Sequence, residues 1–139
     1  MNINQILTPN AQALDAINLL LPELTGESSP ITAQRLSSII KYHSTRIYIG
    51  YEFGQPAGMY ALASVSVPSG DKVWLEDVVV SPKFRGKGFG RQLVEHAIKE
   101  VKRLYPGVKL MLTSRPSREE ANKLYATLFN KRETNVYTL

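Results

Sequence analysis

Three glycines and several cations precede a helical pattern in the segment SPKFRGKGFGRQLV, residues 81–94. The glycines are Gly86, Gly88 and Gly90, and the cations are Lys83, Arg85, Lys87 and Arg91. The first backbone N–H groups of a helix have no partner and the helix dipole is positive at that end, so anions bind there readily. The segment therefore predicts an anion site, with an ordinary tight turn between a strand and a helix as the alternative.

Two well-known phosphate-binding motifs are absent from this segment. It lacks the pattern G-x-x-x-x-G-K-[ST], which excludes a P-loop. Its glycines miss the G-x-G-x-x-G spacing, and no second strand–helix–strand half follows, which excludes a dinucleotide-binding fold. The predicted anion site must therefore belong to another class.

Two adjacent acids, Glu76 and Asp77, interrupt the apolar stretch VWLEDVVV of residues 73–80. A stretch this apolar predicts a central strand covered on both faces, and strand alternation directs the two carboxylates to opposite faces. An ionised carboxylate is costly in such a place unless it is paired or faces a wet cavity. One acid is therefore a candidate proton acceptor, and a structural ion pair is the alternative for each.

A tyrosine lies on the apolar side of the helix predicted for residues 118–129. The sequence SREE predicts a capping box, with Ser117 as the N-cap and Glu120 at the third position. Tyr125 shares a face with apolar residues, so its ring is expected to point inward. Its hydroxyl is a candidate general acid, although periodicity alone favours a core tyrosine with a hydrogen-bonded hydroxyl.

The elements that must position these residues are a mixture of strands and helices. Strands are predicted for residues 2–7, 46–53, 57–67, 73–80, 108–113 and near 135–139. Four helices are predicted. The first starts at an N-cap Thr8 and is ended or kinked by Pro22, and the second is capped by Thr32. The third reaches about Tyr105, with His96 facing solvent, and the fourth spans residues 118–129. This order predicts an α/β (α+β) fold in one domain, residues 1–139, with helices on the faces of the sheet.

Composition narrows the class of protein further. The chain has no cysteine, which excludes disulfides, thiolate metal sites and a cysteine nucleophile. Its start lacks a signal-peptide pattern and no stretch approaches about 18 consecutive apolar residues, so a cytoplasmic protein without a membrane segment is expected. The net charge of +5 suits an anionic partner. Because the densest cations sit at one helix end, no nucleic acid is expected, and a basic nucleic-acid-binding domain is kept as an alternative.

The motif Arg85-x-x-Gly88-x-Gly90 after EDVVVSP closely resembles the acetyl-CoA signature [QR]-x-x-G-x-[GA] of the GCN5-related N-acetyltransferase (GNAT) family. Downstream, EEANKLYATLFNKRETNVYTL is similar to the final helix and strand of that family. The two matches together cover residues 73–139. The resemblance implies a mixed, mostly antiparallel sheet that splays apart around an acetyl-CoA cleft.

The resemblance also implies roles for particular residues. Similar polyamine and amino-sugar-phosphate enzymes also carry Leu-Glu-Asp at this place, and their glutamate, which Glu76 matches, serves as the base. Tyr125 matches the family tyrosine that protonates the leaving thiolate. Acetyl-CoA would bind along the strand and the glycine loop, at Val78, Val79, Val80, Arg85, Gly86, Lys87, Gly88, Phe89, Gly90 and Arg91. Family members often carry a cofactor-binding asparagine seven residues before this tyrosine. Here that position is Arg118, so the contact is expected to shift to Asn122 or to be lost.

These observations favour a metal-free, acetyl-CoA-dependent N-acetyltransferase that transfers the acetyl group directly to a primary amine. A small-molecule amine is expected in preference to a protein N-terminus or lysine. A non-catalytic acyl-CoA-binding module is the alternative from another class, and the presence of both Glu76 and Tyr125 argues against it. The sequence is compatible with a homodimer. It contains no pattern that identifies the acceptor amine.

Overall fold

A five-stranded sheet with the strand order β1-β2-β3-β4-β5 organises the chain. The structure is a computed structural model that describes residues 1–139. The strands are β1 (Asn2–Gln5), β2 (Thr45–Glu52), β3 (Gln55–Val67), β4 (Gly70–Val80) and β5 (Leu110–Met111). Neighbouring strands are antiparallel from β1 to β4, and β5 pairs with β4 in parallel. The predicted mixed, mostly antiparallel sheet is confirmed.

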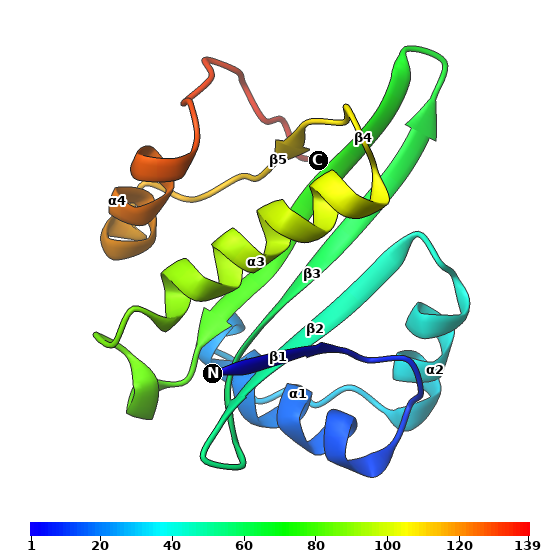
Figure 1. The fold of residues 1–139 in the computed structure, drawn as a ribbon, viewed down its shortest axis with the longest axis vertical. Helices are drawn as coiled ribbons and strands as arrows, with labels where there is room; N and C mark the ends of the chain where they lie inside the picture. The colour runs from blue at the N-terminus through cyan, green and yellow to red at the C-terminus, as the bar shows by residue number, and fades with distance from the viewer.

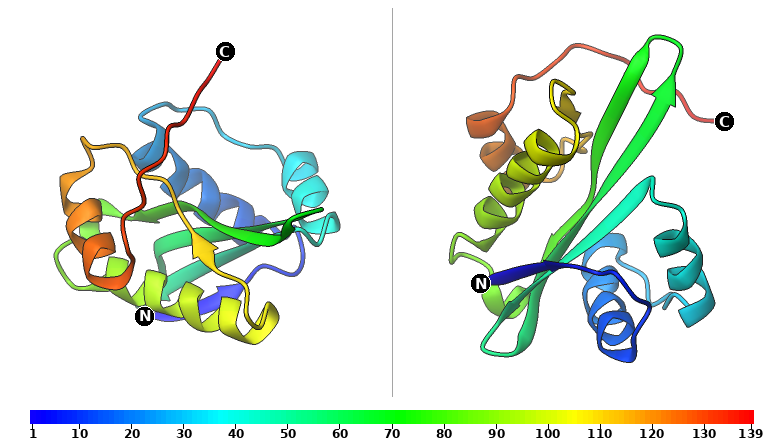
Figure 2. Two further views of the ribbon diagram at one scale, coloured as in Figure 1. Left: turned by 90° about the horizontal axis from the view of Figure 1, so that it is seen from above. Right: turned by 45° about the vertical axis from the view of Figure 1, so that its right-hand side comes forward.

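Four helices cover the two faces of this sheet (Figure 1). They are α1 (Ala11–Thr25), α2 (Ala33–Lys41), α3 (Phe89–Leu104) and α4 (Glu119–Leu128), with a short 3-10 turn, η1 (Pro82–Phe84), ahead of α3. The helices α1 and α2 lie on one face, whereas α3 crosses the other (Figure 2). None of these helices has the length and apolar composition needed to cross a membrane.

Strand alternation divides the core into two parts, one under each helical layer. On β2, Tyr48 belongs to the core beneath α3, and its neighbour Ile49 belongs to the core beneath α1 and α2. From α3 the buried residues Leu93, Val94, Ala97 and Val101 complete the first part, together with Tyr125 of α4. Because α3 and α4 share this core, the loop before α3 and the start of α4 are held next to the same strand.

The first helix begins and ends differently from the prediction. Its N-cap is Asn10 and not Thr8, since the Asn10 side chain accepts a hydrogen bond from the Ala13 N–H at 2.8 Å. The helix continues through Pro22 and ends after Thr25, where Gly26 adopts a φ of 73°. A proline costs the helix one hydrogen bond, and the apolar stripe that packs α1 on the sheet outweighs that loss. The predicted N-cap Thr32 of α2 is confirmed.

The predicted last strand near residues 135–139 is not formed. Residues 130–139 have no regular secondary structure, and Val136 and Tyr137 are 78% and 88% exposed. The pattern in this segment suits a strand, but a strand needs a partner edge. β5 has only two residues, so it offers too short an edge for the segment to pair with.

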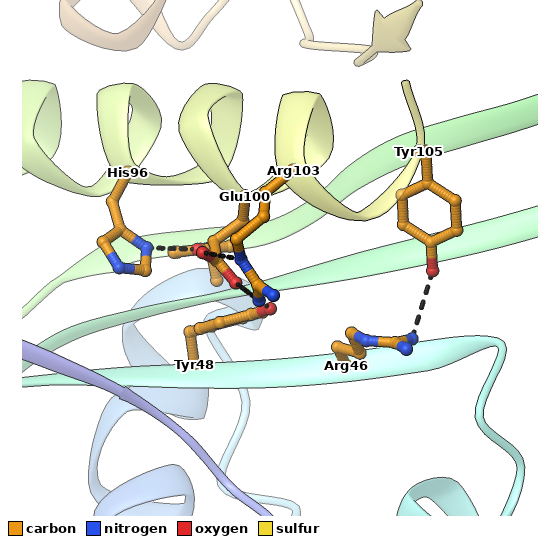
Figure 3. A network of polar contacts seen from close by, with 7 residues as sticks. Arg46, Tyr48, His96, Glu100, Arg103 and Tyr105 are labelled. Carbon is orange, nitrogen blue, oxygen red and sulfur yellow. Dashed lines mark hydrogen bonds and ion pairs between the residues drawn. The ribbon is translucent and has the colours of Figure 1, made fainter. Parts of the chain in front are cut away.

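A polar network joins α3 to the sheet (Figure 3). The Tyr48 hydroxyl donates to Glu100 at 2.9 Å, and the Tyr60 hydroxyl lies 2.6 Å from Nδ1 of His96. Arg103 donates to both carboxylate oxygens of Glu100, at 3.1 and 2.8 Å. The prediction that His96 faces solvent is therefore wrong, because two buried tyrosines of the sheet reach up to α3 and require polar partners there.

Candidate active site

The edge of β4 opens into a pocket where β5 stops. β5 pairs only with Val73 and Trp74, so the last residues of β4 have no strand beside them on that edge. A pocket of about 630 Å³ occupies this position. Its wall is formed by β4, by the glycine loop, by the start of α4 and by one residue of α1; the lining includes Glu23, Val78, Val79, Val80, Phe84, Arg85, Gly86, Gly88, Phe89, Gly90, Ser117, Arg118, Glu119, Glu120, Ala121, Leu124 and Tyr125. The predicted splayed sheet is confirmed.

The glycine loop presents a row of free main-chain donors to this pocket. None of the N–H groups of residues 86–91 donates a hydrogen bond to an acceptor in the protein, and the first backbone bond of α3 runs from Gln92 to the Gly88 carbonyl at 3.1 Å. Gly86 and Gly88 have φ values of 73° and 78°, which L side chains rarely adopt, and an added Cβ at either would meet nothing within 4 Å. Free donors, open space and a helix N-terminus together suit an anion such as a phosphate.

Not every side chain of the loop faces the pocket. Phe89 packs against Phe84, with ring centroids 5.8 Å apart, and this contact holds the loop at the end of the sheet. Lys87 and Arg91 do not line the pocket. The Lys87 ammonium lies 5.5 Å from the Phe84 ring centroid, and Arg91 donates to Glu95 and to Thr127 of α4. Of the four cations of the loop, only Arg85 lines the pocket.

Glu76 and Asp77 lie next to a bulge in β4, where the strand is not covered as predicted. Ala61 of β3 pairs with Glu76 and Met59 pairs with Val79, so two residues of β4 stand opposite one residue of β3. Asp77 adopts a φ of 52° at this point, outside the extended region. The prediction of a covered strand is wrong at this point, because both acidic side chains are exposed. Glu76 keeps its regular pairing with Ala61, so the extra residue falls at Asp77 and Val78.

The surroundings of the bulge shift the pKa of both acids in the same direction. Partial desolvation raises the pKa of Glu76 above its ordinary value, and the neighbouring charge of Asp77 raises it further. Desolvation also raises the pKa of Asp77. Neither acid lines the pocket, but the next residue, Val78, does. The site thus has a carboxylate pair beside the pocket that binds a proton more tightly than an ordinary surface acid.

Tyr125 points into the core, as predicted, and lines the pocket. The residue is 8% exposed, and its ring meets Phe129 edge-on with centroids 6.3 Å apart. Its hydroxyl makes no hydrogen bond within the protein, and burial raises the pKa of the phenol. A protonated phenol with an unused donor is therefore available in the pocket.

The start of α4 differs from the predicted capping box. The N-cap is Arg118 and no side chain caps the helix, because the Glu120 carboxylate pairs with Lys123 at 2.8 Å and does not reach back toward Ser117. Asn122 donates to the Arg115 carbonyl at 2.9 Å and does not line the pocket. Arg118 does line the pocket. Glu23 also lines it, and no local pattern could predict this because Glu23 lies far from the loop in the chain.

The comparison with known families decides the class of the protein. Residues 13–129 match the family model described as the acetyltransferase (GNAT) family. The chain belongs to this family. A relative from Bacillus subtilis (strain 168), the uncharacterized N-acetyltransferase YhdJ, is 28% identical over 93 residues. That match covers 66% of this chain and 65% of the relative, which is just under two thirds of its length.

Solved structures share the whole fold of this GNAT domain. The aminoglycoside acetyltransferase HMB0005 from an uncultured soil metagenomic sample has a TM-score of 0.83 at 15% identity, over 99% of this chain and 96% of that one. The ribosomal-protein-alanine N-acetyltransferase of Brucella melitensis biovar Abortus 2308 has a TM-score of 0.79 at 15% identity, over 99% and 96%. A predicted acetyltransferase with acetyl-CoA from Clostridium acetobutylicum has a TM-score of 0.75 at 16% identity, over 99% and 94%. At these identities the likeness concerns the fold.

Proposed function

We propose that this GNAT protein is an acetyl-CoA-dependent N-acetyltransferase that transfers the acetyl group directly to a primary amine. The observation that carries this proposal is the row of unpaired main-chain donors from residue 86 to residue 91 at the N-terminus of α3. These donors open onto the pocket that also holds Tyr125 and the free edge of β4. Membership of the family and the acetyl-CoA held by the Clostridium structure of the same fold support the choice of ligand.

The chain offers acetyl-CoA two kinds of main-chain contact. The loop N–H groups and the positive end of the α3 dipole suit the pyrophosphate. Val78 and Val80 lie on the free edge of β4, where an extended amide chain can pair with a strand as a further strand does. When bound, acetyl-CoA supplies an activated acetyl thioester. The residues of this chain orient it and handle the protons.

Glu76 is proposed as the base that takes a proton from the acceptor amine. An alkyl ammonium has a pKa near 10, so the amine is mostly protonated at neutral pH and must lose a proton before it can attack. The raised pKa of Glu76 brings the carboxylate closer to the pH at which it must exchange protons. Because Glu76 stands beside the pocket and not in its lining, we propose that a water molecule relays the proton.

Tyr125 is proposed as the acid that protonates the leaving thiolate. Its hydroxyl is unused by the protein, lies in the pocket and is held in its protonated form by burial. A positioned acid of this kind contributes on the order of 10²–10⁴-fold to a rate. The edge-on contact with Phe129 fixes the ring, so the hydroxyl has little freedom to move away.

The acceptor is proposed to be a small-molecule amine. The exposed acids Glu76 and Asp77 place negative charge beside the pocket, which suits a cationic amine. The aminoglycoside acetyltransferase of the same fold supports this class, and the ribosomal-protein-alanine acetyltransferase makes a protein amine the second candidate. A screen of polyamines, amino sugars and peptides with acetyl-CoA, read as released thiol and as product mass, tests the proposal. Thiol release with a small amine supports it, whereas acetyl-CoA binding without transfer to any acceptor would identify a non-catalytic module.

A further inference from the structure

Two arginines occupy the free edge of β4. The Ser81 N–H donates to the Ala57 carbonyl of β3 at 2.8 Å, so by alternation Val78 and Val80 turn their main-chain groups toward the other, open edge. Arg118 donates to the Val78 carbonyl at 3.3 Å, and Arg85 donates to the Val80 carbonyl at 3.1 Å. These carbonyls are the acceptors that an added strand or an extended amide chain would use.

The two arginines are held with different strength. Arg85 also pairs with Glu23 of α1, with 3.0 Å between Nη2 and Oε2. Arg118 has no carboxylate partner, and its contact with Val78 is the one hydrogen bond that its side chain makes. A guanidinium with five donors prefers a phosphate to a single neutral carbonyl. Arg118 is therefore the cation of the pocket that can change partner most easily.

We propose that Arg118 changes partner when acetyl-CoA binds: it releases the Val78 carbonyl to the amide arm of the ligand and pairs with a phosphate group of the same ligand. The inference rests on the proposed function. Arg118 lines the same pocket as the loop residues Gly86, Gly88, Phe89 and Gly90, whose N–H groups have no partner in the protein. The contact with Val78 satisfies the strand edge in the free protein, and the phosphate contact offsets its loss in the complex.

This exchange predicts opposite effects on two ligands when Arg118 is removed. S-acetylpantetheine carries the amide arm and no phosphate, so it competes with Arg118 for Val78 and gains nothing from the arginine in return. Acetyl-CoA carries the arm and the phosphates, so it gains a charged hydrogen bond. A residue that only stabilises the fold or the pocket would affect both ligands in the same direction.

The test is a titration of both ligands into the wild-type protein and the Arg118→Ala variant, by calorimetry for acetyl-CoA and by NMR shifts for S-acetylpantetheine. We expect the Kd of acetyl-CoA to rise on the order of tenfold, as for the loss of one charged hydrogen bond. We expect the Kd of S-acetylpantetheine to fall by a few-fold. Lys102→Ala is the matched control, because it removes one exposed cation from the last turn of α3, at the end of that helix away from the pocket, and it should change neither value.

Several results would overturn the proposal. If Arg118→Ala weakens both ligands alike, or leaves acetyl-CoA unchanged, Arg118 does not exchange partners. Arg118→Gln provides a second check, since the shorter amide keeps a donor and loses the charge: acetyl-CoA should weaken as with alanine. An unchanged acetyl-CoA Kd in this variant would also contradict the phosphate contact. A wild-type protein that binds no acetyl-CoA would instead refute the proposed function itself, so the two failures are distinguishable.

Discussion

Replacement of Gly88 by glutamate would place a carboxylate among the free main-chain donors. An added Cβ at Gly88 meets nothing within 4 Å, so the side chain fits the apoprotein. The φ of 78° strains any L residue, which costs about 1 kcal/mol of unfolding free energy. For this chain length such a loss lowers Tm by roughly 3–6 °C. The variant is therefore expected to stay folded.

The effect on acetyl-CoA binding should be much larger than the effect on stability. A carboxylate about 4 Å from a phosphate charge is repelled by about 4 kcal/mol at an effective dielectric constant near 20, and salt reduces this value. If roughly half of this repulsion energy remains in salt, the Kd of acetyl-CoA rises about 30-fold or more. The loss should shrink as salt is added, because the repulsion between carboxylate and phosphate is screened.

Gly107→Glu is the matched control for this variant. Gly107 has a φ of 79° and equally open surroundings, and it follows the opposite end of α3. Both substitutions thus impose the same backbone strain and the same charge change. Calorimetric titration of acetyl-CoA and thermal unfolding would be measured on both. Similar Tm losses with a weakened Kd only for Gly88→Glu are expected; an unchanged Kd in folded Gly88→Glu would refute the placement of phosphate at the loop.

Three further predictions concern proton transfer and pH. Tyr125→Phe should lower kcat by on the order of 10²-fold while the acetyl-CoA Kd stays near normal, because only the hydroxyl is removed; full turnover would show that water protonates the thiolate. Glu76→Gln should abolish the acidic limb of kcat/KM against pH, and Asp77→Asn should shift that limb to lower pH, because the Asp77 charge raises the pKa of Glu76; the reverse pattern would exchange their roles. The Arg103 hydrogen bond lowers the pKa of Glu100 in the folded protein. The ionised Glu100 therefore stabilises the fold at pH values above the ordinary carboxyl pKa, and this stabilisation is lost as pH falls from the ordinary pKa through the lowered one. Glu100→Gln should therefore reduce the unfolding free energy at neutral pH by about 1 kcal/mol. This reduction should become smaller as pH falls below the ordinary carboxyl pKa, as measured by urea unfolding.

The features that the sequence predicted are those encoded locally. The glycine loop combines residues that tolerate positive φ with the start of an amphipathic helix, and both signals lie within residues 81–94. The inward orientation of Tyr125 follows from helical periodicity within α4 alone. Thr32 caps α2 through its own side chain, which accepts from the Arg35 N–H at 3.0 Å. Each of these depends on residues a few positions apart.

The features that it missed depend on partners distant in the chain. The bulge at Asp77 exists because β3 fixes the register on both sides of it, and no pattern within β4 reveals this. His96 finds a partner in Tyr60 of β3, and Glu23 reaches the pocket from the end of α1. The predicted last strand is not formed because it lacks a partner distant in the chain. Its sequence suits a strand, and the two-residue β5 provides almost no edge for it.

The central claim is that acetyl-CoA binds at the glycine loop and the adjoining edge of β4. Titration of the isotopically labelled protein with acetyl-CoA, followed through backbone amide NMR shifts, tests it most directly. We predict that the largest shifts occur at residues 86–91 and at residues 78–80. A second hollow, of about 350 Å³ and lined by Asn2, Asn4, Asn10 and Tyr51, lies between β1 and α1. Shifts confined to that hollow, or no saturable shifts at the loop, would contradict the claim.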